Sequence, residues 1–281
     1  MCLPPGTAAS DLCVPPPLIR LHAMNSPTGY IGRKTLAYIN HLQNMAAFAC
    51  DLCAVLLASP LKGRAVVRWG VVEQIYFTAV QALFLIIPLS LLTGSMMLIQ
   101  FAKFSGQVDL GKLMVILVIR EIGPVVTAML VVLRSATAVT IEIGYMNVFN
   151  EIDSLEMTGI DPLRLLAIPR FVGITSAIVC LFIVFDLVAI LGGYGVVRLT
   201  TSIPVGNFLS DIGSAITGAD IIVGLVKALC FGVVISVVTL YHGFQAQKRI
   251  TVIPKITSTA AIECFFYCIV INIFISGLFY F

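Results

Sequence analysis

The chain alternates between long apolar blocks and short polar connections. A helix needs about 20 residues, at a rise of about 1.5 Å per residue, to cross a bilayer. Five of the apolar blocks reach this length, and the connections between them carry charges, glycine or proline. The pattern therefore predicts an all-α integral membrane protein with five transmembrane helices, at residues 75–99, 113–141, 165–197, 221–241 and 260–281.

The sequence before the first block has a different pattern. In residues 35–57, apolar side chains recur every three or four positions and the polar residues lie mostly off that stripe. This spacing favours an N-terminal helix that lies in the membrane interface. Residues 1–30 contain many of the prolines and no periodicity, which predicts a disordered tail. The expected organisation is thus a tail at 1–30 and one membrane domain at 31–281.

Composition agrees with a membrane protein and excludes several other classes. Of 281 residues, 59% are hydrophobic and 11% are charged, with a mean hydropathy of +1.04, which no ordinary soluble domain matches. The net charge is +3 and the basic residues are dispersed, so no nucleic acid partner is expected. The Cys50-x-x-Cys53 pair has no second pair or histidine cluster nearby in sequence, so no metal site is expected.

The chain carries no convincing nucleotide site. The segment from Gly106 to Lys112 resembles the beginning of a phosphate loop, but Leu113 stands where a magnesium-binding Ser or Thr is required, and no strand precedes it. We therefore expect no cofactor in this chain.

Basic residues are distributed unevenly between the two ends of the predicted spans. One end collects Arg33, Lys34, Lys62, Arg64, Arg68, Arg164, Arg170, Lys248, Arg249 and Lys255. The other end has Lys103, Lys112 and Arg198. Since basic loops stay in the cytoplasm, this bias predicts a cytoplasmic N-terminus and a C-terminus on the opposite side.

The stretch from Arg120 to Arg170 carries the candidate chemistry. A charge at the centre of a spanning helix costs about 2.5–3.5 kcal/mol on insertion scales, so Arg120, Glu121 and Arg134 should face a partner or a wet cavity. An acid-rich amphipathic segment follows and ends at Asp161-Pro162, because the residue before proline avoids helical geometry. This segment is the place where another protein could push on the spans.

Within this stretch, the order and spacing of about fifty residues resemble the MlaE (YrbE-type) permease family. These permeases are the membrane subunits of ATP-binding-cassette (ABC) phospholipid transporters that work with Mce-domain proteins. The matching segments are Arg120-Glu121-Ile-Gly123-Pro124, Arg134, Glu142-Ile-Gly144-Tyr-Met146, Glu151-Ile-Asp153-Ser-Leu-Glu156, Gly159-Ile-Asp161-Pro162-Leu-Arg164 and Pro169-Arg170.

The resemblance implies a permease subunit that moves phospholipids between the inner membrane and a periplasmic Mce-type carrier. It also implies a homodimer around a lipid cavity, and a separate cytoplasmic ABC ATPase that binds ATP and magnesium. A gram-negative inner membrane is the expected home, with a plastid envelope or an actinobacterial membrane as alternatives.

The resemblance also assigns roles to particular residues. The acid-rich segment looks like the coupling helix that docks on the ATPase, although an ordinary solvated loop helix is the alternative. The residues of this candidate surface are Glu151, Asp153, Glu156, Asp161 and Arg164. For the substrate cavity, the candidates are Arg120, Glu121 and Lys227 for the headgroup, and Met97, Phe101 and Phe104 for the acyl chains.

Simpler roles remain open for the cavity candidates. Arg120 and Glu121 are about 100° apart on a helix, so they need not pair with each other. Glu121 could instead satisfy Lys227, and Arg120 could satisfy Asp186, on neighbouring helices. The three apolar candidates could simply pack.

Two rival function classes also remain. An ion-coupled secondary lipid transporter could use Glu121, Lys227 and Asp186 as a proton relay. An intramembrane lipid enzyme would need a nucleophile with a base, or a metal. In the sequence, none of the three histidines lies beside a plausible partner, so no catalytic residue is expected.

Overall fold

The computed structural model describes residues 27–58, 64–102, 115–200, 218–246 and 249–280. Helices and short turns account for nearly all of these residues, and no strand occurs among them. The backbone divides into two compact units, Met1–Ala47 and Phe48–Phe281. Within the described residues the chain is therefore all-α, as the sequence predicts.

The N-terminal helix α1 spans Pro27–Ala58. Proline suits its first turn, because a backbone N–H there would have no helical partner. The helix begins earlier than the predicted interfacial helix at 35–57 and includes residues 27–30, which were assigned to the tail. The rest of the predicted tail, residues 1–26, lies outside the described residues.

Five helical segments in the described residues are long and apolar enough to cross a membrane, which confirms the predicted fold class. Each is at least 27 residues long, whereas about 20 residues are enough to cross a bilayer. The segments are Val67–Gln100, Leu117–Val148, Leu163–Val196, Gly218–Phe244 and Ile250–Phe279.

Several of these segments change helix type along their length. Four stretches among the described residues widen into π-helix, a form that is rare and often found at functional sites. The first segment consists of α2 (Arg64–Ile75), η2 (Tyr76–Val80) and α3 (Gln81–Ala102). The second consists of η3 (Val115–Ile122), α5 (Gly123–Val131), η4 (Val132–Ala136) and α6 (Thr137–Val148). The remaining elements are α7 (Glu151–Met157), η5 (Leu163–Ala167), α8 (Ile168–Thr200), α10 (Gly218–Phe244), η6 (Ile250–Val252) and α11 (Ile253–Tyr280).

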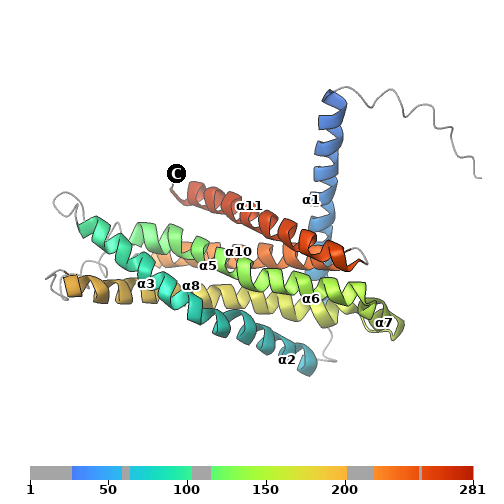
Figure 1. Cartoon of the computed structure of the whole chain (residues 1–281), viewed down its shortest axis with the longest axis horizontal. Helices are drawn as coiled ribbons and strands as arrows, with labels where there is room; N and C mark the ends of the chain where they lie inside the picture. The colour runs from blue at the N-terminus through green and yellow to red at the C-terminus, as the bar shows by residue number, and fades with distance from the viewer. Residues whose placement is uncertain (1–26, 59–63, 103–114, 201–217, 247–248, 281) are drawn as a thin grey trace, which may run out of the picture. The chain divides into compact units, whose positions relative to one another are not determined.

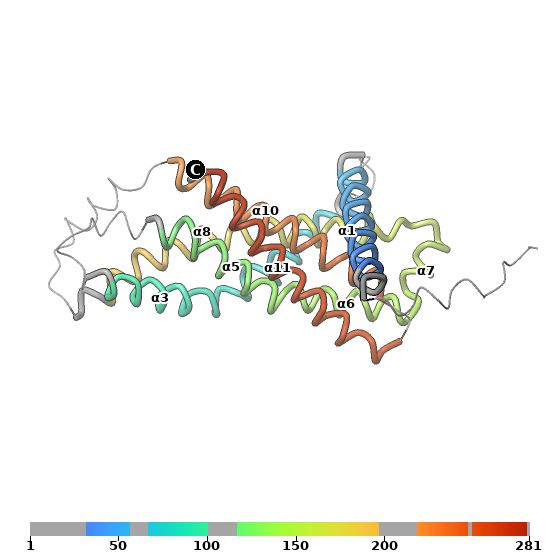
Figure 2. The backbone as a smooth tube through the Cα atoms, turned by 90° about the horizontal axis from the view of Figure 1, so that it is seen from above, coloured from blue at the N-terminus to red at the C-terminus, as the bar shows by residue number. Residues whose placement is uncertain are grey.

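Helices α8 and α10 form the centre of the second unit. Phe185 and Ile178 from α8, and Phe231 and Ile235 from α10, are completely buried. Helices α2 and α3 pack on α8, whereas α6 and α11 pack on α10. Figure 2 shows that α11 runs obliquely across the other spans.

Small residues allow α3 and α8 to touch along their backbones. A Cβ atom added at Gly94 would lie 2.1 Å from the carbonyl oxygen of Ala189, and one added at Gly193 would lie 2.8 Å from the carbonyl carbon of Gly94. Close backbone approach at small residues is a common way to pack helices in a membrane, where the surrounding lipid is as apolar as the side chains.

A short helical hairpin lies at one end of the spans (Figure 1). Asn150 (φ 57°) turns the chain from α6 into α7, and Gly159 (φ 77°) turns it back towards α8. The Asn147 amide donates to the carbonyls of Phe244 (2.9 Å) and Ala246 (2.8 Å). The hairpin, comprising residues 149–161, is therefore at the same end of the bundle as the connection between α10 and α11.

Candidate functional site

Arg120 and Glu121 lie on the π-helical stretch η3 and have different partners. Arg120 forms an ion pair with Asp220, at the start of α10, whereas Glu121 pairs with Lys227 two turns further along the same helix. The predicted alternative pair of Glu121 with Lys227 is therefore confirmed. The alternative pair of Arg120 with Asp186 is wrong, because Asp220 takes that place.

The Lys227 ammonium group is completely buried and fully hydrogen-bonded. Its three N–H groups donate to the Arg120 carbonyl (2.8 Å), to Glu121 Oε1 (2.9 Å) and to Ser276 Oγ (2.7 Å). A buried charge is tolerated when it is paired and all of its donors are satisfied. This part of the cluster is therefore stable in the apolar interior.

Helix α11 completes the coordination of Glu121. Ser276 Oγ donates to Glu121 Oε1 (2.8 Å), and Asn272 Nδ2 donates to Glu121 Oε2 (3.0 Å). Sequence reasoning missed both residues, although polar side chains four positions apart in an apolar helix lie on one face and could have indicated a shared partner. We call Arg120, Glu121, Asp220, Lys227, Asn272 and Ser276 the charged cluster.

The charged cluster is open on one side. The Glu121 side chain is 29% exposed and that of Arg120 is 22% exposed, whereas Lys227 is 0% and Asp220 is 3% exposed. A ligand can therefore reach the Arg120 guanidinium and the Glu121 carboxylate first. Lys227 can contact a ligand only after the hydrogen bonds around it rearrange.

Asp186, on α8, lies close to the charged cluster without joining it. Its Oδ1 atom is buried and has no hydrogen-bond partner in the described part of the chain. A Cβ atom added at Gly123 would lie 2.4 Å from this oxygen, so only glycine leaves room for the carboxylate.

Two of the three apolar candidates, Met97 and Phe101, belong to a different helix from those that build the charged cluster. Met97 is half-buried in α3, which packs on α8, whereas the cluster is built by η3, α10 and α11. Phe101 belongs to the last turn of α3, and Phe104 lies outside the described residues. Contact of these three side chains with an acyl chain stays a prediction.

The hairpin presents acidic and apolar side chains together. Glu151, Glu156 and Asp161 are exposed, and Asp153 is half-buried. Glu151 and Asp153 occupy the first turn of α7, where the helix dipole stabilises negative charge. Asp161 also has a structural role, because its Oδ1 accepts a hydrogen bond from the Leu163 backbone N–H (3.0 Å) at the start of η5.

Exposed apolar side chains surround these acids, which sequence reasoning did not anticipate. Met157 is 89% exposed and Phe149 is 61% exposed, while the buried Ile152 anchors α7. Arg164 is half-buried on η5, behind the hairpin. A surface that combines acids with exposed apolar groups suits a protein partner that carries basic residues.

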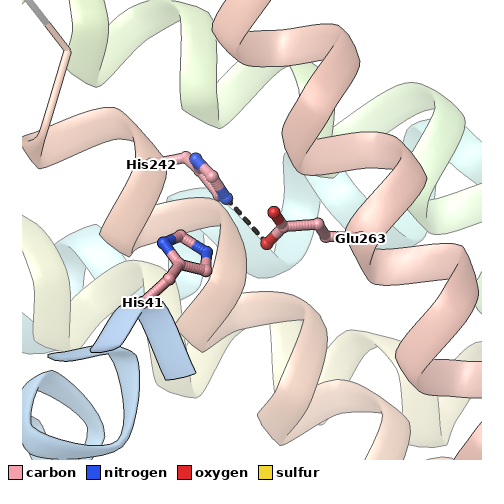
Figure 3. Close-up of side chains that lie close together, drawn as sticks. All are labelled: His41, His242 and Glu263. Carbon is pink, nitrogen blue, oxygen red and sulfur yellow. Dashed lines mark hydrogen bonds and ion pairs between the residues drawn. The ribbon is translucent and has the colours of Figure 1, made fainter. Parts of the chain in front are cut away.

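A histidine and a carboxylate meet where α10 and α11 are connected. His242 Nε2 lies 3.0 Å from Glu263 Oε2 (Figure 3). The expectation that none of the histidines has a plausible partner is therefore wrong for His242, because tertiary folding brings together residues that are 21 positions apart. The pair joins the end of α10 to the beginning of α11.

Comparison with known proteins identifies the relatives of this chain. Residues 71–278 match the family described as Permease MlaE. A probable ABC transporter permease protein of Rickettsia conorii is 24% identical over 89% of this chain and 96% of its own length. The intermembrane phospholipid transport system permease protein MlaE of Haemophilus influenzae is 32% identical over 68% of this chain and 76% of its own length. A probable ABC transporter permease protein of Synechocystis is 25% identical over 78% of this chain and 84% of its own length.

Proposed function

Since this chain belongs to the MlaE permease family, it is a transport subunit of an ABC phospholipid transporter, and we propose that its charged cluster receives the lipid headgroup. The observation that carries this proposal is the partly exposed Arg120 beside a buried, fully bonded Lys227. A phospholipid has the complementary chemistry, with an anionic phosphate and apolar tails.

Arg120 is the side chain suited to bind the phosphate. Its planar guanidinium can donate two parallel hydrogen bonds to phosphate oxygens, as it does to a carboxylate. A lipid phosphate would exchange with Asp220 as the partner of Arg120. Because one anion replaces another, the guanidinium of Arg120 stays paired throughout the exchange.

Glu121 and Lys227 would determine the local charge and the shape of the site where the lipid phosphate replaces Asp220. Their pair, together with Asn272 and Ser276, holds η3, α10 and α11 together. Movement of α11 relative to the other two helices would break these bonds and expose Lys227. Transport would then follow from changes in the exposure of the cluster, and no bond in the lipid is made or broken.

We propose that the hairpin receives the force from the ATPase. Its acids would pair with basic residues of a cytoplasmic ABC ATPase subunit, which binds ATP and magnesium. The hairpin continues directly into α6 on one side and into η5 and α8 on the other, so displacement of α7 would move both spans. On this proposal, the hairpin and the N-terminus would lie in the cytoplasm and the C-terminus in the periplasm, in an inner membrane.

A homodimer and an Mce-type periplasmic partner complete the proposed assembly. Only 17% of the most apolar window of the last span is buried within the described chain. Its exposed side chains include Phe266, Ile273 and Phe274 on α11, the helix that also completes the charged cluster. A second copy that packs near this helix would enclose the cluster in a shared cavity, from which lipid passes to the Mce-type carrier.

Lipid transfer by the reconstituted transporter tests the proposal. Arg120→Ala should reduce ATP-dependent phospholipid transfer in proteoliposomes by about tenfold, since a charge-assisted contact is lost, while assembly with the ATPase persists. Arg249→Ala is the matched control, because this exposed arginine lies outside the cluster and should leave transfer unchanged. Normal transfer by the Arg120→Ala variant would mean that Arg120 only pairs with Asp220 within the fold and does not bind lipid.

The same assay distinguishes ATP-driven transport from ion-coupled transport. A variant of the partner ATPase that lacks its phosphate-loop lysine should abolish transfer, whereas collapse of the proton gradient should not. The opposite pair of results would favour a relay through Glu121, Lys227 and Asp186.

A further inference from the structure

A groove lined by aromatic and charged side chains lies between helices that do not build the charged cluster. It runs between α2 and η2 on one side and η5 and α8 on the other, and its volume is about 620 Å³. Trp69, Tyr76, Phe77, Glu142 and Arg170 contribute to its walls. We call it the outer groove.

Close helix packing builds the floor of the outer groove. A Cβ atom added at Gly173 on α8 would lie 2.6 Å from the side chain of Gln74, and one added at Gly70 would lie 3.2 Å from Pro169 Cβ. Arg134 fixes the far wall, because it donates to the Phe77 carbonyl (3.1 Å) and to Gln81 Oε1 (2.7 Å). The groove is therefore a built feature of the fold.

Arg170 has unused hydrogen-bonding capacity in this groove. Its side chain is 10% exposed, and its Nη2 atom lies 2.7 Å from Glu142 Oε1. Its Nη1 atom is buried and has no hydrogen-bond partner within the described residues. Buried donors are almost always satisfied, so this guanidinium is arranged for an acceptor that the described residues do not supply.

Glu142 covers Arg170 loosely. The Glu142 side chain is 56% exposed, so it can rotate into solvent or headgroups at little cost. Its departure would leave Nη2, the nitrogen that Glu142 now contacts, without a partner next to the unpartnered Nη1. A tetrahedral oxyanion can accept hydrogen bonds from Nη1 and Nη2 at the same time, whereas the Glu142 carboxylate contacts Nη2 alone.

Aromatic residues place the outer groove at a membrane surface. Trp69 is 70% exposed and Tyr76 is 58% exposed, and both side-chain types concentrate where headgroups meet acyl chains. Glu142 lies in the middle of α6, which leads into the hairpin, and Leu165 on η5, which follows the hairpin, also lines the groove, so the groove is in the hairpin half of the bundle. A ligand here would have an anionic group at headgroup depth and apolar chains beside the first span.

We propose that the outer groove binds the phosphodiester of a membrane phospholipid, which displaces Glu142 and is held by Arg170. Trp69 and Tyr76 contact the glycerol region and the upper acyl chains. This inference rests on the proposed function in one respect, namely that the ligand is a phospholipid. It is separate from the charged cluster, so a lipid in the groove and a lipid at Arg120 occupy different places.

Photo-crosslinking of the full transporter in nanodiscs tests this site. The probe is phosphatidylethanolamine with a diazirine on an acyl chain close to the glycerol, and the comparison probe is a diacylglycerol with the same diazirine. Labelling of the peptide that contains Trp69 and Tyr76 is divided by labelling around Phe84 and Leu92, which are exposed on the apolar surface of α3. This ratio corrects for general contact with lipid.

The phospholipid probe should give a ratio about tenfold higher than the diacylglycerol probe, because only the former has a phosphate for Arg170. Arg170→Ala should lower the phospholipid ratio by about tenfold, and Arg170→Lys should lower it less. Glu142→Gln should keep or raise the ratio, because it removes the competing carboxylate. A purely structural ion pair would instead make Arg170→Ala and Glu142→Gln lose labelling together, which would overturn the proposal.

Two further outcomes would also overturn it. Equal ratios for the two probes would mean that lipid lies in the groove through apolar contact alone. Complete loss of labelling on addition of glycerophosphoethanolamine, which has the phosphodiester but no acyl chains, would assign the groove to a soluble ligand. Because the readout is local labelling, it does not depend on transfer: Arg120→Ala should leave the ratio unchanged even if the role proposed for Arg120 fails.

Discussion

The charged cluster and the hairpin contain similar numbers of charged side chains but stabilise them in opposite ways. In the cluster, Lys227 is 0% exposed and has three hydrogen-bond partners from two other helices. In the hairpin, Glu151 and Glu156 are exposed to solvent. The comparison indicates that Lys227 in the cluster is held by partners within the fold, whereas the exposed acids of the hairpin are available to another molecule.

The distance between partners along the sequence differs as well. The contacts of Glu121 reach across 106 residues to Lys227 and 155 residues to Ser276. The hairpin is held by local bonds, such as those from Ser154 Oγ to the Glu151 carbonyl (2.7 Å) and from Thr158 Oγ1 to the Leu155 carbonyl (2.7 Å). Changes in the cluster should therefore affect stability, and changes in the hairpin should affect docking.

The largest effect is expected for Lys227→Met. Removal of the buried cation leaves Glu121 without its counter-charge, and breaking a buried pair costs about 3–5 kcal/mol of the free energy of unfolding. Denaturant titration in detergent micelles would measure the loss. The double variant with Glu121→Gln removes both charges and should recover most of the stability; a single variant as stable as the parent chain would contradict the assignment.

Charge reversal on the hairpin should act on assembly alone. Glu151→Lys combined with Glu156→Lys places cations opposite the basic partner surface and should weaken ATPase binding by about a hundredfold. Co-purification of the ATPase would measure this, with unchanged helix content as the check on folding. Asp51→Lys, at an exposed position of α1, is the matched control. If ATPase recovery stayed normal, the hairpin would be a solvated loop.

Ser276→Ala should have a moderate effect on stability. The variant removes the acceptor for Lys227 and a donor to Glu121, which should cost about 1–3 kcal/mol because both partners are charged. Ser258→Ala, exposed on the same helix, should change the free energy of unfolding by less than about 0.5 kcal/mol. If the two variants lowered the free energy of unfolding equally, the hydrogen bonds of Ser276 to the cluster would not contribute to stability.

The smallest effect is expected for Gly159→Ala. Its φ of 77° is in the left-handed region, and no atom lies within 4 Å of an added Cβ, so backbone strain alone should cost about 1 kcal/mol. Hydrogen exchange of the hairpin amides would report it as local loosening. Gly195→Ala, in α8 with equally open surroundings, should instead strengthen its helix, since alanine is the better helix former. Loosening at both sites would argue against strain at Gly159.

Sequence reasoning was most successful where a signal is local. The apolar blocks predicted all five spans, because each helix must bury its own backbone polar groups within the membrane. The acids between residues 151 and 156 predicted the short helix α7, since their signal acts within a few residues. The predicted end at Asp161-Pro162 is wrong, because α7 ends at Met157 and the chain turns at Gly159 (φ 77°). The role of these acids in docking stays a prediction.

The candidate site was only partly accessible to the same reasoning. Arg120, Glu121 and Lys227 could be recognised because a charge inside an apolar block needs a partner. The pair of Glu121 with Lys227 was predicted as one alternative and is confirmed. The partner of Arg120 was not predicted, because a charge such as Asp220 at the start of a span looks like an ordinary helix end. Asn272 and Ser276 were missed because a lone amide or hydroxyl in a span is inexpensive.

The sequence by itself determined the class of protein, the number of its spans and the segments that carry charge, because hydrophobicity and local turn chemistry act over short distances along the chain. Only the tertiary structure decided that Arg120 pairs with Asp220, that α11 closes around Glu121, and that Arg170 keeps a donor unsatisfied beneath the outer groove. These contacts join residues that are far apart in sequence, and they depend on how the helices rotate and cross, which no local pattern records.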